Sequence, residues 1–247
     1  MKTTIKLRTG ASARFVQAVG EGPLPTVLIV HGWKSREPLR PESSYATLQD
    51  ALAAEGINSL LLCLRGHLGA EGNIATVTRT DHLEDISEAF GWLHDQPSVH
   101  PRRLGAYGTS YGSYLLAASV MNSMLRLMAF RVPALYPDNV LLEPSQTVID
   151  WPGLREWREA VHVDRECLAL AGMSNFKGKL AMFLSEHDEY MPPSIAESYL
   201  IAASSATEAK SEVIPGTKHV LTDAQNAQFQ AKLVKWFSDN FKAQSRP

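Results

Sequence analysis

Cysteine is scarce in this chain of 247 residues, which contains only Cys63 and Cys167. Two cysteines are too few for a disulfide framework or for a zinc site built from cysteine ligands. Both lie in apolar sequence surroundings, which indicates buried and unreactive thiols. We therefore expect a cytoplasmic protein whose fold needs neither disulfide bonds nor a metal.

Long apolar runs are also missing. No stretch approaches the ~18 consecutive apolar residues that mark a membrane span, and no apolar segment follows the charged N-terminus, residues 1–6. The sequence therefore shows neither a membrane helix nor a signal peptide. We expect a soluble intracellular protein with no membrane partner.

Charge of one sign is not concentrated anywhere in the chain. The sequence has 24 lysines and arginines against 26 aspartates and glutamates, for a formal net charge of -2. A protein that binds a phosphate backbone needs a basic patch, and the basic residues here are scattered. We expect no nucleic-acid partner.

What the chain does contain is an ordinary globular composition, with 45% hydrophobic and 20% charged residues. A chain of this length can fold around one large core when it forms an α/β sheet. We therefore expect residues 1–247 to form a single domain.

Short apolar strands alternate with amphipathic helices along most of the sequence. This alternation predicts an α/β fold with a mainly parallel, doubly wound sheet and helices on both faces. Residues 3–8 and 13–18, joined by Thr9-Gly10, predict an antiparallel hairpin at the sheet edge. The predicted parallel strands cover residues 26–30, 58–64, 103–107, 127–131 and 180–185. One predicted helix starts at a Ser43 or Ser44 cap, and the other main predicted helices cover residues 81–94, 194–203 and 224–241.

The alternation of strands and helices is interrupted between residues 132 and 177, where several prolines and aromatic residues occur. We interpret this segment as a short lid-like insert over the carboxyl edge of the sheet, with helices near 154–161 and 165–171. Its apolar residues are candidates for the walls of a small acyl pocket, although each is equally an ordinary core residue. The candidate pocket residues are Leu135, Tyr136, Trp151 and Trp157, with Trp33 and Tyr111 in addition.

The segment 108–112, Gly-Thr-Ser-Tyr-Gly, stands between a predicted strand and apolar residues at helical spacing from 114 to 121. Glycines around a serine at a strand-to-helix turn allow the tight, strained geometry that exposes a nucleophilic hydroxyl. The backbone N–H of Tyr111 at the start of the helix would face the developing oxyanion. Ser110 is therefore the predicted nucleophile, and a simple glycine-rich turn is the competing interpretation.

A serine nucleophile requires a histidine base that is oriented by a carboxylate. Asp188 follows the predicted strand at 180–185, and we choose it as the acid, with Glu186 and Glu189 as competing candidates. His219 lies after another apolar strand and before the last helix, which makes it the predicted base. The other histidines that could take this role are His162 and His187.

With these motifs, residues 26–241 resemble the α/β-hydrolase superfamily. His31-Gly32-Trp33 is similar to the family's oxyanion turn, which implies that the N–H of Trp33 joins that of Tyr111 and that His31 is structural. Residues 64–72 are similar to the family's Arg-Gly-His-Gly-x-Ser loop, from which Leu68 and Ala70 depart. The insert resembles that of small-lidded esterases and of dienelactone-hydrolase-like or prolyl-oligopeptidase-like members.

These observations predict a serine hydrolase that cleaves a small carboxylic ester through an acyl-enzyme, with no cofactor and a small-molecule acyl substrate. A thioesterase or a small peptidase with the same three residues is the alternative. A peptidase that binds a free amino terminus needs carboxylates at its pocket, and Glu156 with Glu159 could supply them. A non-catalytic binding protein with the same fold is a further alternative.

Overall fold

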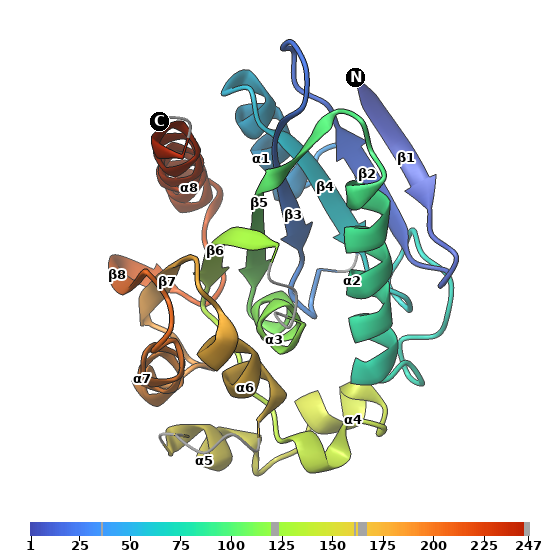
Figure 1. The fold of residues 1–247 in the computed structure, drawn as a ribbon. Coiled ribbons are helices and arrows are strands. Elements are labelled where there is room, and N and C mark those ends of the chain that lie inside the picture. Colours follow the sequence, from blue (N-terminus) through green and yellow to red (C-terminus); the bar gives the residue numbers. More distant parts are fainter. Residues whose placement is uncertain (36, 120–123, 161, 163–166, 245–247) are drawn as a thin grey trace.

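The computed structural model describes residues 1–35, 37–119, 124–160, 162 and 167–244. Its centre is an eight-stranded sheet with the order β1-β2-β4-β3-β5-β6-β7-β8 (Figure 1). The six strands β4-β3-β5-β6-β7-β8 pair in parallel, whereas β1 pairs antiparallel with β2 and β2 pairs antiparallel with β4. The strands are β1 (Lys2–Lys6), β2 (Ser12–Val16), β3 (Leu24–Val30), β4 (Asn58–Cys63), β5 (Val99–Thr109), β6 (Leu125–Arg131), β7 (Lys179–His187) and β8 (Glu208–Lys218).

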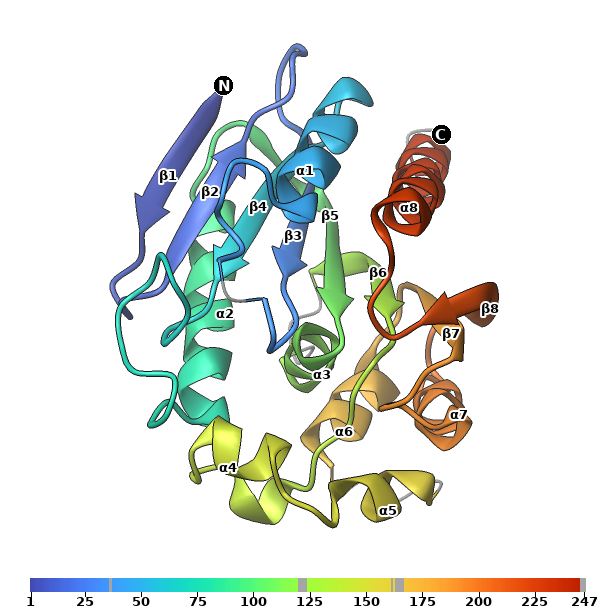
Figure 2. The same cartoon turned by 180° about the vertical axis from the view of Figure 1, so that it is seen from behind.

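Helices cover both faces of the sheet, as Figures 1 and 2 show from opposite sides. Alternate residues of each strand point to opposite faces, so Leu28 and Val30 enter one core while Val27 and Ile29 enter the other. The first core is covered by α2 (Arg79–His94), α3 (Tyr111–Ala118), α6 (Leu168–Asn175) and α7 (Pro193–Ala202), and the second by α1 (Ser44–Ala54) and α8 (Asp223–Ala243).

The mainly parallel α/β sheet expected from the sequence is confirmed, and so is the edge hairpin of β1 and β2. Ser43 is the cap of α1, since its side chain accepts a hydrogen bond from the N–H of Ala46. Strand β5 begins at Val99, four residues before the predicted start at Arg103. Its first residues are largely polar and exposed, and Val99 pairs with β3 before the register shifts. Part of the helix predicted near residue 121 lies outside the described residues.

The segment between β6 and β7 contains α4 (Ser145–Ile149), α5 (Leu154–Glu159) and α6, together with a short 3-10 turn at Asp138–Val140. Figure 1 shows α4 and α5 beyond the carboxyl ends of the central strands. Helix α5 matches the first predicted helix to Glu159, and α6, from Leu168, matches the described part of the second. Val161 and Arg165 lie outside the described residues. Helix α4 was not predicted, because five residues are too short for a periodic signal.

None of the helices in the described parts of the chain combines the length and the hydropathy that a membrane crossing requires.

Candidate active site

Ser110 stands at the junction of β5 and α3 in a strained backbone conformation. Its φ of 51° and ψ of -110° place a non-glycine residue in the left-handed half of backbone space. The N–H of Ser110 donates to the carbonyl of Arg131 on β6 at 2.8 Å, which holds the turn in place. This geometry resembles the strained strand-to-helix turn on which serine nucleophiles are found.

The glycines on either side of Ser110 are required by the closeness of the backbone. A Cβ on Gly108 would lie 2.6 Å from the backbone nitrogen of Ser113, and a Cβ on Gly112 would overlap the carbonyl of Val30 on β3. Any larger residue would have to displace main chain rather than a flexible side chain. The glycine pattern read from the sequence therefore has a steric cause here.

Asp188 and His219 meet at the carboxyl ends of β7 and β8. The Nδ1 of His219 lies 3.0 Å from Oδ1 and 2.9 Å from Oδ2 of Asp188, and both side chains are largely buried. The N–H groups of Tyr190 and Met191 also donate to Oδ1 of Asp188 at 2.9 Å. Burial raises the pKa of Asp188, but the hydrogen bond and charge of His219 and these two N–H groups outweigh it and hold the pKa below its usual value.

The two competing carboxylates of the same loop bind main chain instead of the imidazole. Glu186 accepts a hydrogen bond from the N–H of Gly216 at 2.7 Å, and Glu189 accepts one from the N–H of His219 at 3.2 Å. Glu186 therefore joins the end of β7 to β8, and Glu189 joins the loop after β7 to the backbone of His219. Of the three acids, only Asp188 contacts the His219 ring.

The remaining candidate bases lie elsewhere. The ring of His162 stacks on Trp157 with its centroid 4.0 Å away, and the exposed His187 contacts Glu186 at 3.5 Å. Neither residue lines the cavity that contains Ser110 and His219.

That cavity has a volume of about 490 Å³ and opens at the carboxyl edge of the sheet. Ser110 and His219 both line it, together with Trp33 from the loop after β3 and Met191 from the loop after β7. The insert contributes Tyr136, Ile149, Asp150 and Arg158.

The pocket wall expected from the sequence needs correction. Of the four insert residues chosen, only Tyr136 lines the cavity. Leu135 is fully buried in the core, Trp151 is 45% exposed and Trp157 packs on His162. Aromatic character alone could not show which face of each short helix points inward.

The turn of Gly32 and Trp33 lies directly against Ser110. A Cβ on Gly32 would come within 3.7 Å of the Ser110 Cβ, and Trp33 lines the same cavity. Tyr111 is the first residue of α3, where a helix leaves its N–H groups without partners inside the helix. The rings of Trp33 and Tyr111 also pack edge to face, with centroids 5.3 Å apart.

Two buried histidines hydrogen-bond to the carbonyl groups of this turn. The backbone N–H of Leu64 donates to Nε2 of His31 at 3.2 Å, so Nδ1 of His31 carries the proton and donates to the carbonyl of Gly32 at 2.9 Å. The Nε2 of His67 lies 3.0 Å from the carbonyl of Trp33 and donates to it. The loop at residues 64–72 therefore supports the Trp33 turn through His67.

His82 on α2 is a buried partner of Tyr111 that the sequence analysis missed. Its Nε2 lies 3.0 Å from the carbonyl of Arg65 and donates to it, so its Nδ1 accepts from the Tyr111 hydroxyl at 2.8 Å. That hydroxyl in turn contacts the hydroxyl of Ser145 on α4 at 3.1 Å. Its only sequence signal was a histidine one turn before Ile86 on the apolar face of the helix.

Acid should destabilise the fold through His82. Burial lowers the pKa of His82 to about 4, and the charges of His67 and Arg65 act in the same direction. The unfolded chain therefore binds more protons between about pH 6.5 and 4, so stability falls as the pH falls through this window, by about 3 kcal/mol at pH 4. Urea unfolding at several pH values should show the advantage of the parent over His82→Gln shrinking toward pH 4, and parallel pH curves would contradict this.

The comparisons with known proteins identify a family and a fold. Residues 15–140, just over half of the chain, match the X-Pro dipeptidyl-peptidase (S15) family. The chain belongs to this family. No curated protein is significantly similar to this S15-family chain over its sequence.

Solved structures similar to this S15-family chain include both esterases and peptidases. Est1E from Butyrivibrio proteoclasticus, solved with ferulic acid, is 17% identical with a TM-score of 0.72, and the match covers 98% of this chain and 99% of that one. The acylaminoacyl peptidase of Pyrococcus horikoshii is 14% identical with a TM-score of 0.70, and a puromycin-hydrolyzing peptidase of Mycobacterium tuberculosis is 16% identical with a TM-score of 0.71. The match covers 98% and 96% of this chain but only 41% and 40% of those two peptidases. These likenesses show an α/β-hydrolase fold.

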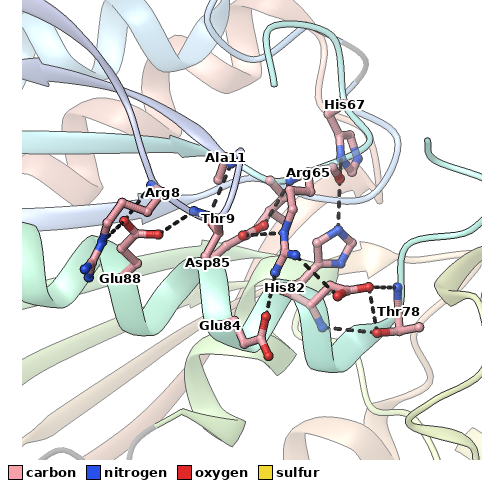
Figure 3. Close-up of polar contacts among 12 residues, drawn as sticks. Arg8, Thr9, Ala11, Arg65, His67, Thr78, His82, Glu84, Asp85 and Glu88 are labelled. Atoms are coloured by element: carbon pink, nitrogen blue, oxygen red, sulfur yellow. Dashed lines mark hydrogen bonds and ion pairs between the residues drawn. The ribbon is translucent and has the colours of Figure 1, made fainter. Parts of the chain in front are cut away.

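In this S15-family chain the Arg65 loop is anchored to α2 by ion pairs (Figure 3). The Nε of Arg65 lies 2.7 Å from the fully buried Asp85, and its other nitrogens contact Asp81 at 3.3 Å and Glu84 at 3.1 Å. Since His67 follows Arg65 by two residues, the same anchor fixes the histidine that supports Trp33.

Both cysteines of this S15-family chain are free and buried. Burial raises the pKa of Cys63 to about 12 and that of Cys167 to about 11. Within the described ranges, no three histidine, cysteine or acidic side chains are placed to hold a metal ion.

Proposed function

We propose that this S15-family hydrolase cleaves small carboxylic esters by nucleophilic catalysis with Ser110, His219 and Asp188. The observation that carries the proposal is the shared cavity, in which the strained Ser110 and the Asp188-bound His219 both line the wall. The small-lidded arrangement of the insert, residues 132–177, and the likeness to Est1E support an ester substrate.

In the proposed mechanism, the Ser110 hydroxyl oxygen attacks the ester carbonyl while Nε2 of His219 takes its proton. Asp188 holds Nδ1 of His219 and stabilises the imidazolium that forms. The backbone N–H groups of Trp33 and Tyr111 stabilise the oxyanion. The imidazolium then protonates the departing alcohol, and water, activated by His219, releases the acid from Ser110.

A fluorophosphonate probe tests the nucleophile directly. We expect it to label the folded protein once, on the peptide that contains Ser110, as read by mass spectrometry after digestion. Heat-unfolded protein is the control, since an activated serine loses its reactivity when its surroundings unfold. Failure of the folded protein to react, or labelling at another serine, would contradict the proposal.

A small peptidase is the second candidate, because the family is named for a peptidase and the similar structures include peptidases. The carboxylates that could bind a free amino terminus, Glu156 and Glu159, are both exposed and do not line the cavity. Turnover of acyl esters, acyl thioesters and aminoacyl amides by the purified protein distinguishes the candidates. A clear preference for amides would replace the esterase proposal with the peptidase one.

A further inference from the structure

Arg158 is a buried cation in the wall of the Ser110 cavity. It lies on α5 with only 6% of its surface exposed, and it lines the cavity beside Tyr136. Its Nε donates to the carbonyl of Leu135 at 3.0 Å, which fixes the guanidinium group. Its Nη2 is buried and has no hydrogen-bond partner in the part of the chain that the structure describes.

No carboxylate among the described residues forms an ion pair with Arg158. On the same helix Glu156 is exposed, and Glu159 instead pairs with Arg155 at 3.6 Å. The Arg158 guanidinium lies over the Tyr136 ring at 4.7 Å, and a second guanidinium, that of Arg79, lies 5.8 Å from the same ring. Two guanidinium groups therefore lie close to the Tyr136 ring, and among the carboxylates of the insert Asp150 also lines the cavity.

An unpaired buried cation is costly to a fold, and the cost is recovered when an anion binds it. A guanidinium group presents its N–H groups in one plane. This arrangement matches a carboxylate or a phosphate better than the other groups that are common in small metabolites. The cavity of about 490 Å³ has room for a small ester in addition to such a group.

We propose that Arg158 binds a carboxylate of the substrate and thereby selects small esters that carry a negative charge, such as half-esters of short dicarboxylic acids. This inference rests on the proposed ester hydrolysis at Ser110. On α5, Arg158 lines the cavity, whereas Glu156 and Glu159 are exposed to solvent and do not line it.

The test compares matched pairs of methyl esters by proton release. The pairs are monomethyl succinate with methyl butyrate, monomethyl glutarate with methyl valerate, and monomethyl adipate with methyl hexanoate. In at least one pair the parent should favour the charged ester in kcat/KM, and Arg158→Met should lower this preference about 10- to 100-fold. Arg158→Lys should keep part of it, since the charge remains. The ratio within a pair removes any general effect of the substitution on folding or catalysis.

Arg155→Met is the matched control, because it removes a positive charge from the exposed side of the same helix. It should leave the preference unchanged. An equal preference in the parent and Arg158→Met at all three chain lengths, or an equal loss in Arg155→Met, would overturn the inference.

A binding measurement separates this inference from the proposed function. Calorimetric titration of monomethyl glutarate into Ser110→Ala, with and without Arg158→Met, needs no turnover. We expect binding that is weakened about 10-fold or more by Arg158→Met. If the parent cleaves no ester but this binding is seen, the proposed reaction fails and the anion site stands; if affinity does not depend on Arg158, the anion site fails.

Discussion

Ser110→Ala should lower kcat/KM for a good ester substrate by about 10⁴- to 10⁶-fold, which is the loss that follows removal of a nucleophile from a serine hydrolase. The remaining activity would come from substrate binding and oxyanion stabilisation alone. Initial rates of ester hydrolysis, with the protein purified from a host that lacks contaminating esterases, measure the effect. A loss of less than about 10-fold would exclude Ser110 as the nucleophile.

Ser113→Ala is the matched control for Ser110→Ala. Ser113 lies one turn further along α3, is fully buried and donates to the carbonyl of Gly108 at 2.8 Å. Its loss removes a structural hydrogen bond worth about 1 kcal/mol and should leave turnover within a few fold of the parent. Thermal unfolding of both variants shows whether a loss of activity reflects lost chemistry or lost fold.

Asp188→Asn should lower kcat about 10⁴-fold near neutral pH, the second largest effect that the structure predicts. Asp188 receives the Nδ1 proton of His219, and an amide nitrogen in its place would favour the tautomer with the proton on Nε2, where it blocks general-base action. Steady-state kinetics at several pH values measure the loss.

Glu189→Gln in the same loop and Glu186→Gln at the end of β7 are the controls. Their carboxylates accept hydrogen bonds from the backbone of the His219 loop, and an amide oxygen can still accept these bonds. We expect losses of less than about 10-fold. A loss in Glu189→Gln as large as that in Asp188→Asn would move the role of the acid to Glu189.

The fold could be predicted from the sequence because its elements carry strong local signals. Buried parallel strands such as Val27–Val30 are continuous apolar runs, and α2 and α8 have long apolar faces. The insert was harder to predict, since α4 and α5 are too short to show a period. Which side of α5 faces the cavity depends on its packing against other elements, so Arg158 could not be identified in advance.

The groups proposed for the chemistry could be predicted from the sequence, whereas the histidines that support their surroundings could not. Ser110, Asp188 and His219 each follow a strand, and the carboxyl ends of parallel strands meet at one edge of the sheet. His67 and His82 support the Trp33 turn and Tyr111 through contacts between segments distant in sequence. Such contacts leave no spacing pattern in the chain, and only the folded structure reveals them.

The strained turn at Ser110 has a consequence for the order in which this protein becomes competent. Its backbone is held by the carbonyl of Arg131 on β6, and Gly112 packs against Val30 on β3, so neither strand alone imposes the conformation. The proposed partners, Asp188 and His219, come only with the last two strands. Under the proposed mechanism, a growing or partly folded chain carries an ordinary serine, and reactivity requires the complete sheet.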